Sequence, residues 1–145
     1  MKKSLFIAFI MLFGISFIEA QQAKPSCSLI MCSKVEQDNG RTNLMNTFSA
    51  FNESALNSTQ YFSLYLVFRG YEPKKAHTHY TKLVQVSTNT TTLETQSRSF
   101  VLDGLDYVHT HTHNWEVNFK AKGLYYIAVY VDNVEAQRTY FSVGD

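Results

Sequence analysis

Strict alternation of apolar and other side chains is the feature of this sequence that most constrains its fold. Between residues 60 and 69, every second position is a large apolar residue: Phe62, Leu64, Leu66 and Phe68. Side chains two positions apart on an extended chain point to the same face, so this pattern predicts a strand with one face in a hydrophobic core. No sustained 3.6-residue apolar period follows residue 20, so we expect no helix longer than about two turns.

The same alternation recurs along the chain. Further strands are expected at residues 28–37, 42–51, 77–86, 98–103, 107–119 (the longest), 124–131 (apolar on both faces, hence central) and 135–143 (with Phe141 and Val143 inward). Asp38-Asn39-Gly40 and Asp132-Asn133 favour tight hairpin turns, and the threonine-rich residues 87–96 are expected to form a loop. About eight strands at this spacing are typical of an all-β antiparallel sandwich.

The first twenty residues have the pattern of a secretory signal peptide. Lys2 and Lys3 precede an apolar run from Leu5 to Ile18, and Ala20 is small enough to precede a cleavage site. An uncleaved anchor is the alternative. We therefore expect a signal peptide at 1–20, a flexible segment at 21–27 and one sandwich domain at 28–145, with no membrane span after cleavage. The protein should be secreted to the extracellular space, or be periplasmic or on the cell surface if it is bacterial.

Composition excludes several classes of protein. Charged residues make up 17% and aromatic residues 14% of the chain, which argues against intrinsic disorder. The formal net charge is +1, so no electrostatic footprint for nucleic acid or an anionic membrane is present. The mature chain of about 125 residues suits a single domain.

Two cysteines, Cys27 and Cys32, remain after the signal segment. An oxidising compartment favours a disulfide, but an extended chain would separate these residues by ~16 Å, far beyond the ~5–6 Å of a disulfide. We expect two thiols, or an intermolecular bridge through Cys27. We expect Cys32 to be buried and to pack as a small apolar residue.

Three N-x-[ST] sequons begin at Asn52, Asn57 and Asn89. All three lie in polar, loop-like stretches. A eukaryotic host could glycosylate them there.

Three stretches carry a family resemblance: the apolar strand at residues 28–33, the turn and second strand at 38–48, and Gly123-Leu124-Tyr125 leading an alternating strand into Asp132. With these features, residues 28–143 resemble a family of small uncharacterised bacterial proteins with an immunoglobulin-like β-sandwich. The resemblance implies this fold and no known activity. In such sandwiches a tyrosine at the Gly-x-Tyr position fills the core edge, and its hydroxyl finds a backbone partner.

All five histidines fall in two alternating clusters. One contains His77 and His79, and the other contains His109, His111 and His113. On a strand, residues i and i+2 point the same way ~6.6 Å apart, so two such imidazoles can share one metal ion. A third imidazole from a neighbouring strand would complete a zinc or copper site.

A metal-free role is the competing interpretation. The three histidines of the second cluster share a strand face with Tyr107, Trp115, Val117 and Phe119. The last three of these should be core, so the histidines can simply be the solvated end of a strand that is longer than the core. Threonines alternate with the histidines and suit any strand, because threonine is β-branched.

A site shared by both clusters needs His79 and His111 within ~10 Å of each other. In an up-and-down sheet, one intervening strand at 98–103 would let both clusters begin at the same end of the sandwich. A further strand hidden in residues 87–96 would place them at opposite ends.

The sequence offers little support for catalysis. It contains neither a Gly-x-Ser-x-Gly nor a His-Glu-x-x-His motif, and Asp103 and Asp106 flank a turn as turn formers do. We expect no enzyme. The first functional hypothesis is a secreted binding module for a protein or carbohydrate, using outward tyrosines such as Tyr61 and Tyr65. The alternative is an extracellular zinc- or copper-binding protein that uses the five histidines; no other cofactor is expected.

Overall fold

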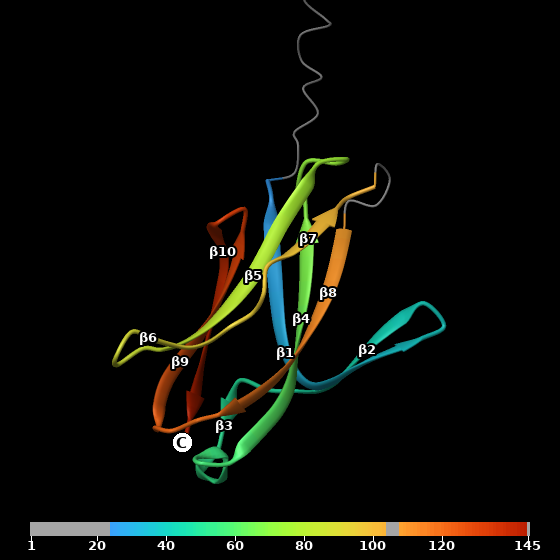
Figure 1. Cartoon of the computed structure of the whole chain (residues 1–145). Helices are drawn as coiled ribbons and strands as arrows, with labels where there is room; N and C mark the ends of the chain where they lie inside the picture. The colour runs from blue at the N-terminus through green and yellow to red at the C-terminus, as the bar shows by residue number, and fades with distance from the viewer. Residues whose placement is uncertain (1–23, 104–107, 145) are drawn as a thin grey trace, which may run out of the picture.

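The computed structural model describes residues 24–103 and 108–144. Within them the chain forms ten strands and one short 3-10 turn (Figure 1). In chain order the elements are β1 (Ser26–Asp38), β2 (Arg41–Thr47), β3 (Ala50–Phe51), η1 (Glu53–Ala55), β4 (Thr59–Arg69), β5 (Ala76–Gln85), β6 (Thr90–Glu94), β7 (Arg98–Val101), β8 (Val108–Asn118), β9 (Gly123–Val131) and β10 (Val134–Val143). No helix in this part of the chain is long and apolar enough to cross a membrane.

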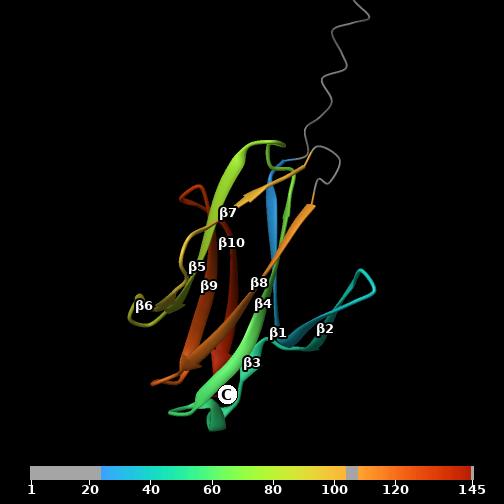
Figure 2. The same ribbon diagram turned by 45° about the vertical axis from the view of Figure 1, so that its right-hand side comes forward.

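The strands form two sheets that pack face to face, as the turned view shows (Figure 2). The first sheet has the order β2-β1-β4-β8, and the second has the order β3-β10-β9-β5-β6, with β7 also paired to β5. Every pair of strands is antiparallel except β3 with β10. The structure is therefore an all-β antiparallel sandwich, as predicted.

The strand order is that of an immunoglobulin-like fold. If the six long strands β1, β4, β5, β8, β9 and β10 are lettered A, B, C, E, F and G, one sheet contains A-B-E and the other G-F-C. Tyr125, at the start of β9, donates a hydrogen bond of 2.7 Å from its hydroxyl to the carbonyl oxygen of Ala121. This is the tyrosine corner found between strands E and F of such sandwiches, and it agrees with the predicted role of the Gly-x-Tyr strand entry.

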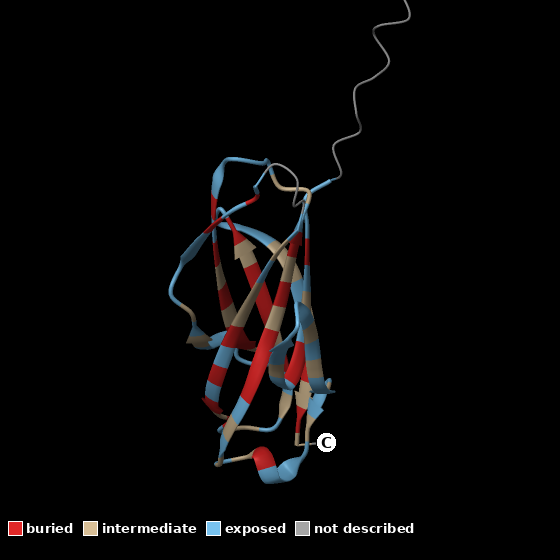
Figure 3. Cartoon of the chain, turned by 90° about the vertical axis from the view of Figure 1, so that its right-hand side faces the viewer, coloured by how far each residue is buried: buried red, intermediate tan, exposed pale blue. Residues whose placement is uncertain are grey.

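The core lies between the sheets, on the faces that the alternation predicts. All four inward residues of β4 are buried: Phe62, Leu64, Leu66 and Phe68. β9 is central, lying between β10 and β5, and the inward Phe141 and Val143 of β10 are buried too. Figure 3 shows the buried positions distributed along the strands of both sheets, while the turns that connect the strands are mostly exposed.

Two hairpin turns have the backbone that their residues favour. Asn39 and Gly40 have φ values of 48° and 76°, and Asp132 and Asn133 have values of 50° and 65°. Positive φ at both central residues matches the twist of the flanking strands. The β1–β2 hairpin extends away from the body of the sandwich (Figure 1).

The expected strand at 42–51 is wrong as a single element. β2 ends at Thr47 in the first sheet, and β3 pairs with β10 in the second. The chain crosses between the sheets here because two aromatic side chains turn inward: Phe48 and Phe51 lie 4.9 Å apart between ring centroids, and both contact Phe62.

Three smaller expectations also need correction. The threonine-rich segment contains strand β6 rather than only a loop, which together with β3 raises the number of strands from eight to ten. The longest strand is β1, with 13 residues, because its second half continues into the protruding hairpin. β1 also begins at Ser26, two residues before the expected domain boundary.

Both cysteines are free thiols within β1, as expected. Cys32 is buried, as predicted. Cys27 is also buried, whereas the sequence suggested a place in the flexible start, and burial raises the pKa of its thiol to about 12. The position of Cys27 in the core therefore argues against an intermolecular bridge.

The sequon asparagines Asn52, Asn57 and Asn89 are all exposed in turns or short connections. The predicted signal peptide lies outside the described residues.

Candidate metal centre

Three of the five predicted histidines converge between the sheets. His79 comes from β5 in the second sheet, and His111 and His113 come from β8 in the first. In the strand registers His111 lies opposite Leu66 and His113 opposite Leu64, both buried core residues. Residues directly opposite each other point to the same face, so both imidazoles of β8 are directed into the sandwich.

The three imidazoles are in mutual contact. Ring centroids are 4.9 Å apart for His79 and His111, 5.4 Å for His79 and His113, and 4.6 Å for His111 and His113. One ligating nitrogen of each ring lies within 4.8 Å of the other two. His79 is 1% and His113 6% exposed, and His111 is half-buried.

Four of the six ring nitrogens of the triad are buried and have no hydrogen-bond partner in the described part of the chain. These unpartnered atoms are both nitrogens of His79 and the Nε2 atoms of His111 and His113. A buried polar atom without a partner costs about 1–3 kcal/mol. A metal ion would satisfy several of these lone pairs at once, so the residues fit such a ligand.

Burial keeps these imidazoles in the neutral form that binds metals. Desolvation, reinforced by the neighbouring histidines and Arg98, lowers the pKa of His79 to about 3. The same causes lower the pKa of His113 to about 4, and desolvation with Arg98 and His109 lowers the pKa of His111. At neutral pH each ring therefore offers an unprotonated nitrogen.

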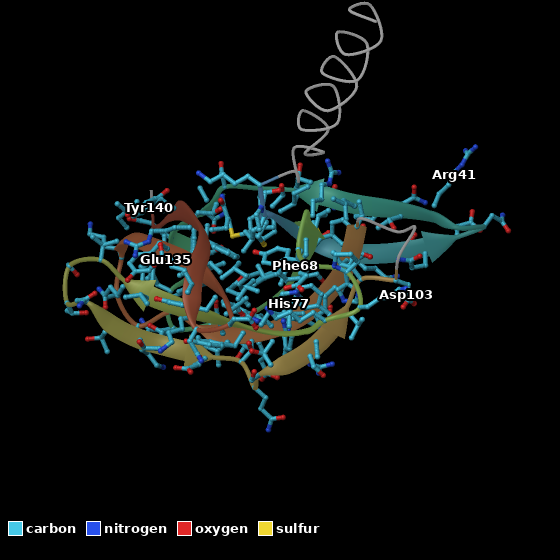
Figure 4. All side chains as sticks on the ribbon, turned by 90° about the horizontal axis from the view of Figure 1, so that it is seen from above. Arg41, Phe68, His77, Asp103, Glu135 and Tyr140 are labelled. Atoms are coloured by element: carbon cyan, nitrogen blue, oxygen red, sulfur yellow. The ribbon has the colours of Figure 1, made fainter. Side chains whose placement is uncertain are left out.

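The other two histidines lie outside this triad. His77 is buried, but its Nδ1 atom lies 2.7 Å from the Oδ2 atom of Asp132 in the β9–β10 turn. His109 stacks on Phe100, with ring centroids 5.0 Å apart and an interplanar angle of 14°. Seen from above, His77 and Phe68 lie between the two sheets, whereas Arg41 points away at the tip of the β1–β2 hairpin (Figure 4).

The two histidine clusters lie at the same end of the sandwich because of the way β6 and β7 pair with β5. A further strand, β6, does lie in the threonine-rich segment, yet the clusters are not at opposite ends. β6 pairs with the second half of β5 and β7 with the first half, so together they act as one interrupted strand along the same edge. The chain then crosses to the other sheet, where β8 begins at the same end as β5 (Figure 1).

The interpretation of the second histidine cluster as the solvated end of a strand is wrong for His113, which is buried. The strand does not extend beyond the core there, because Phe68, Phe100 and Leu102 continue the core to this end of the sandwich.

One neighbour of the triad has no signal in the sequence. Arg98 of β7 lies directly opposite His79 in the antiparallel ladder, so both side chains leave the sheet on the same face. Only the register of β7 against β5 reveals that the two residues are neighbours.

Of the other candidate residues named from the sequence, Tyr61 is 70% exposed, Tyr65 is half-buried and Asp103 is exposed. Asp106 and Tyr107 lie outside the described residues.

The fold and the site define an immunoglobulin-like β-sandwich with a buried histidine triad that could hold a metal ion. No family model and no curated protein sequence matches this chain, so the resemblance noted in the sequence holds at the level of the fold alone.

Among solved structures, the chain is similar to a CARDB domain from Pyrococcus furiosus determined in complex with di-metal ions. The identity is 14%, the match covers 83% of this chain and 94% of that one, and the TM-score is 0.43. It is also similar to part of the alkylpurine DNA glycosylase AlkC from Pseudomonas fluorescens, bound to DNA with an abasic-site analogue. That match has 10% identity, a TM-score of 0.43, and covers 81% of this chain but 30% of the glycosylase.

Proposed function

We propose that this protein is an extracellular metal-binding β-sandwich in which His79, His111 and His113 bind one divalent transition-metal ion, zinc or copper. The observation that carries the proposal is the convergence of their buried nitrogens, which lack hydrogen-bond partners within the described residues. Imidazole ligands suit zinc and copper, whereas calcium and magnesium prefer oxygen.

The triad needs only a small adjustment to bind such an ion. Zinc–nitrogen bonds of 2.0–2.1 Å in a tetrahedral site place ligand nitrogens about 3.3 Å apart. The nitrogens lie within 4.8 Å of one another in the structure. Closing this gap requires side-chain movements of about 1 Å, which modest imidazole rotations supply.

The position of the triad favours a binding role over a catalytic one. A bound ion would join β5 in one sheet to β8 in the other, across the layer in which the two clusters of buried apolar residues lie. Since the ion would bind the folded chain and not the separated sheets, it would stabilise the sandwich by mass action.

Calorimetric titration of metal-stripped protein with Zn²⁺ and Cu²⁺ tests the proposal. We expect one ion per chain, and we expect His79→Gln and His111→Gln each to abolish or greatly weaken binding. His109→Gln is the matched control, because His109 is on the same strand but outside the triad. Circular dichroism would establish that each variant is folded. Binding that is absent, or that is unchanged in both triad variants, would overturn the proposal.

A second function, recognition of a protein or carbohydrate, is favoured by a different observation. The Tyr61 ring on the outer face of β4 is 70% exposed, and no further layer covers this face among the described residues. Aromatic rings on a strand can stack on sugar rings or pack on a partner. An array of defined oligosaccharides tests the carbohydrate form: binding should be saturable and lost in Tyr61→Ala, and its absence from the whole array would reject it.

A further inference from the structure

Charge balance at the histidine triad points to a fourth ligand. Three neutral imidazoles leave a divalent ion with its full double positive charge between the sheets. An uncompensated charge in a protein interior is strongly unfavourable unless an opposite charge accompanies it. The three histidines also leave one position free in a tetrahedral ion.

The described residues around the triad supply no negative charge. β4 contributes the apolar Leu64, Leu66 and Phe68, and the inward face of β8 carries His109, His111 and His113, followed by Trp115. From β5 and β7 come His79 and Arg98. Within the described residues, the group of possible metal ligands at this place consists of His79, His111 and His113 and includes no aspartate or glutamate.

Arg98 instead adds a positive charge beside the site. Its side chain shares a sheet face with His79, and the residue is exposed, so solutes can reach it. No carboxylate within the described residues forms an ion pair with its guanidinium. Guanidinium groups are well suited to carboxylates and oxyanions, because they can donate two parallel hydrogen bonds.

We propose that the metal-loaded triad takes a small free anion, a carboxylate or an oxyanion such as bicarbonate, as its fourth ligand, and that Arg98 helps to hold this anion. This inference rests on the proposed metal binding. The anion would partly neutralise both the ion and the guanidinium, and it would enter at the edge where β7 faces solvent. The protein would then bind a metal–anion pair rather than a bare ion.

Protein loaded with Co²⁺ provides the test, because the visible absorption of Co²⁺ reports changes in its ligands. Titration with acetate, bicarbonate and phosphate should change the spectrum saturably for at least one of them. Arg98→Ala should weaken the affinity for that anion by about tenfold, and Arg98→Lys by less, while the affinity for Co²⁺ changes little. Arg138→Ala is the control, because Arg138 pairs with Glu135 away from the triad and should leave both affinities unchanged.

The outcomes separate the two proposals. Failure of Co²⁺ to bind would overturn the proposed metal site and the anion with it. Binding of one Co²⁺ per chain with a spectrum indifferent to all three anions would reject the anion alone, and would indicate that water or hydroxide completes the coordination. Equal anion affinity in Arg98→Ala and the wild type would remove Arg98 from the site.

Discussion

His79 and His111 belong to different sheets, yet their ring centroids lie 4.9 Å apart in the middle of the sandwich. With His113 they form a contact that links β5 to β8 without any covalent bond. Immunoglobulin domains commonly use a disulfide between their two sheets. Here both cysteines are on one strand, and the proposed link is a metal ion.

Metal binding should therefore raise thermal stability. A ligand at about 100 times its dissociation constant adds about 2.7 kcal/mol to the free energy of unfolding, which corresponds to about 10 °C for a domain of this size. Differential scanning fluorimetry with and without Zn²⁺ measures this shift. EDTA should reverse it, His79→Gln should not show it, and an equal shift in that variant would place the ion elsewhere.

Acid should destabilise the metal-free protein through the same histidines. Burial lowers the pKa of His79 to about 3 and that of His113 to about 4, against about 6.5 in the unfolded chain. Below pH 6.5 the unfolded state therefore binds protons that the folded state does not. The free energy of unfolding should be insensitive to these groups above pH 7 and fall towards pH 4 by roughly 1.4 kcal/mol per pH unit for each group.

Urea unfolding at pH values from 7.5 to 4.5 measures this dependence. The slope should be shallower in His79→Gln. A free energy of unfolding that is constant from pH 7.5 to 5 in the metal-free wild type would contradict the buried, neutral state of the triad.

Truncation of the inward face of β4 should be costly. Leu66 is fully buried between the sheets, so Leu66→Ala should lower the free energy of unfolding by roughly 2–5 kcal/mol through lost burial and the cavity left behind. Tyr61→Ala on the same strand is the matched control and should change it by less than about 0.5 kcal/mol, because that ring is exposed. Equal losses in chemical denaturation would mean that the two faces of β4 are assigned wrongly.

The cysteines should be inert to thiol reagents in the folded protein. Burial raises the pKa of Cys27 to about 12 and also raises the pKa of Cys32, so neither forms the reactive thiolate at pH 8. Reaction with DTNB should be slow in native buffer and should release two equivalents of chromophore in urea, one for each free thiol. Rapid native labelling would show that β1 opens readily.

Secretion can be checked directly. The tripartite pattern of the first twenty residues predicts a mature chain that begins near Gln21. Mass spectrometry of protein collected from the medium should lack residues 1–20. Recovery of the protein only from membranes, with Met1 retained, would favour the uncleaved anchor.

The sequence by itself determined the features that depend on neighbours along the chain. Alternation from Phe62 to Phe68 predicted both a strand and its buried face, since the two-residue period of a strand is a local property. Asn39-Gly40 and Asp132-Asn133 predicted their turns for the same reason, because these residues tolerate positive φ. The five candidate histidines were also visible as two alternating clusters.

Only the tertiary structure decided which histidines meet and what surrounds them. Membership of a sheet depends on how two apolar faces pack, and no local pattern states that β5 joins one sheet and β8 the other. That assignment brings His79 to His111 and His113, while it leaves His77 with Asp132 and His109 on Phe100. The pairing of β7 with β5 likewise places Arg98 beside His79, because a register between strands is set by contacts distant in the chain.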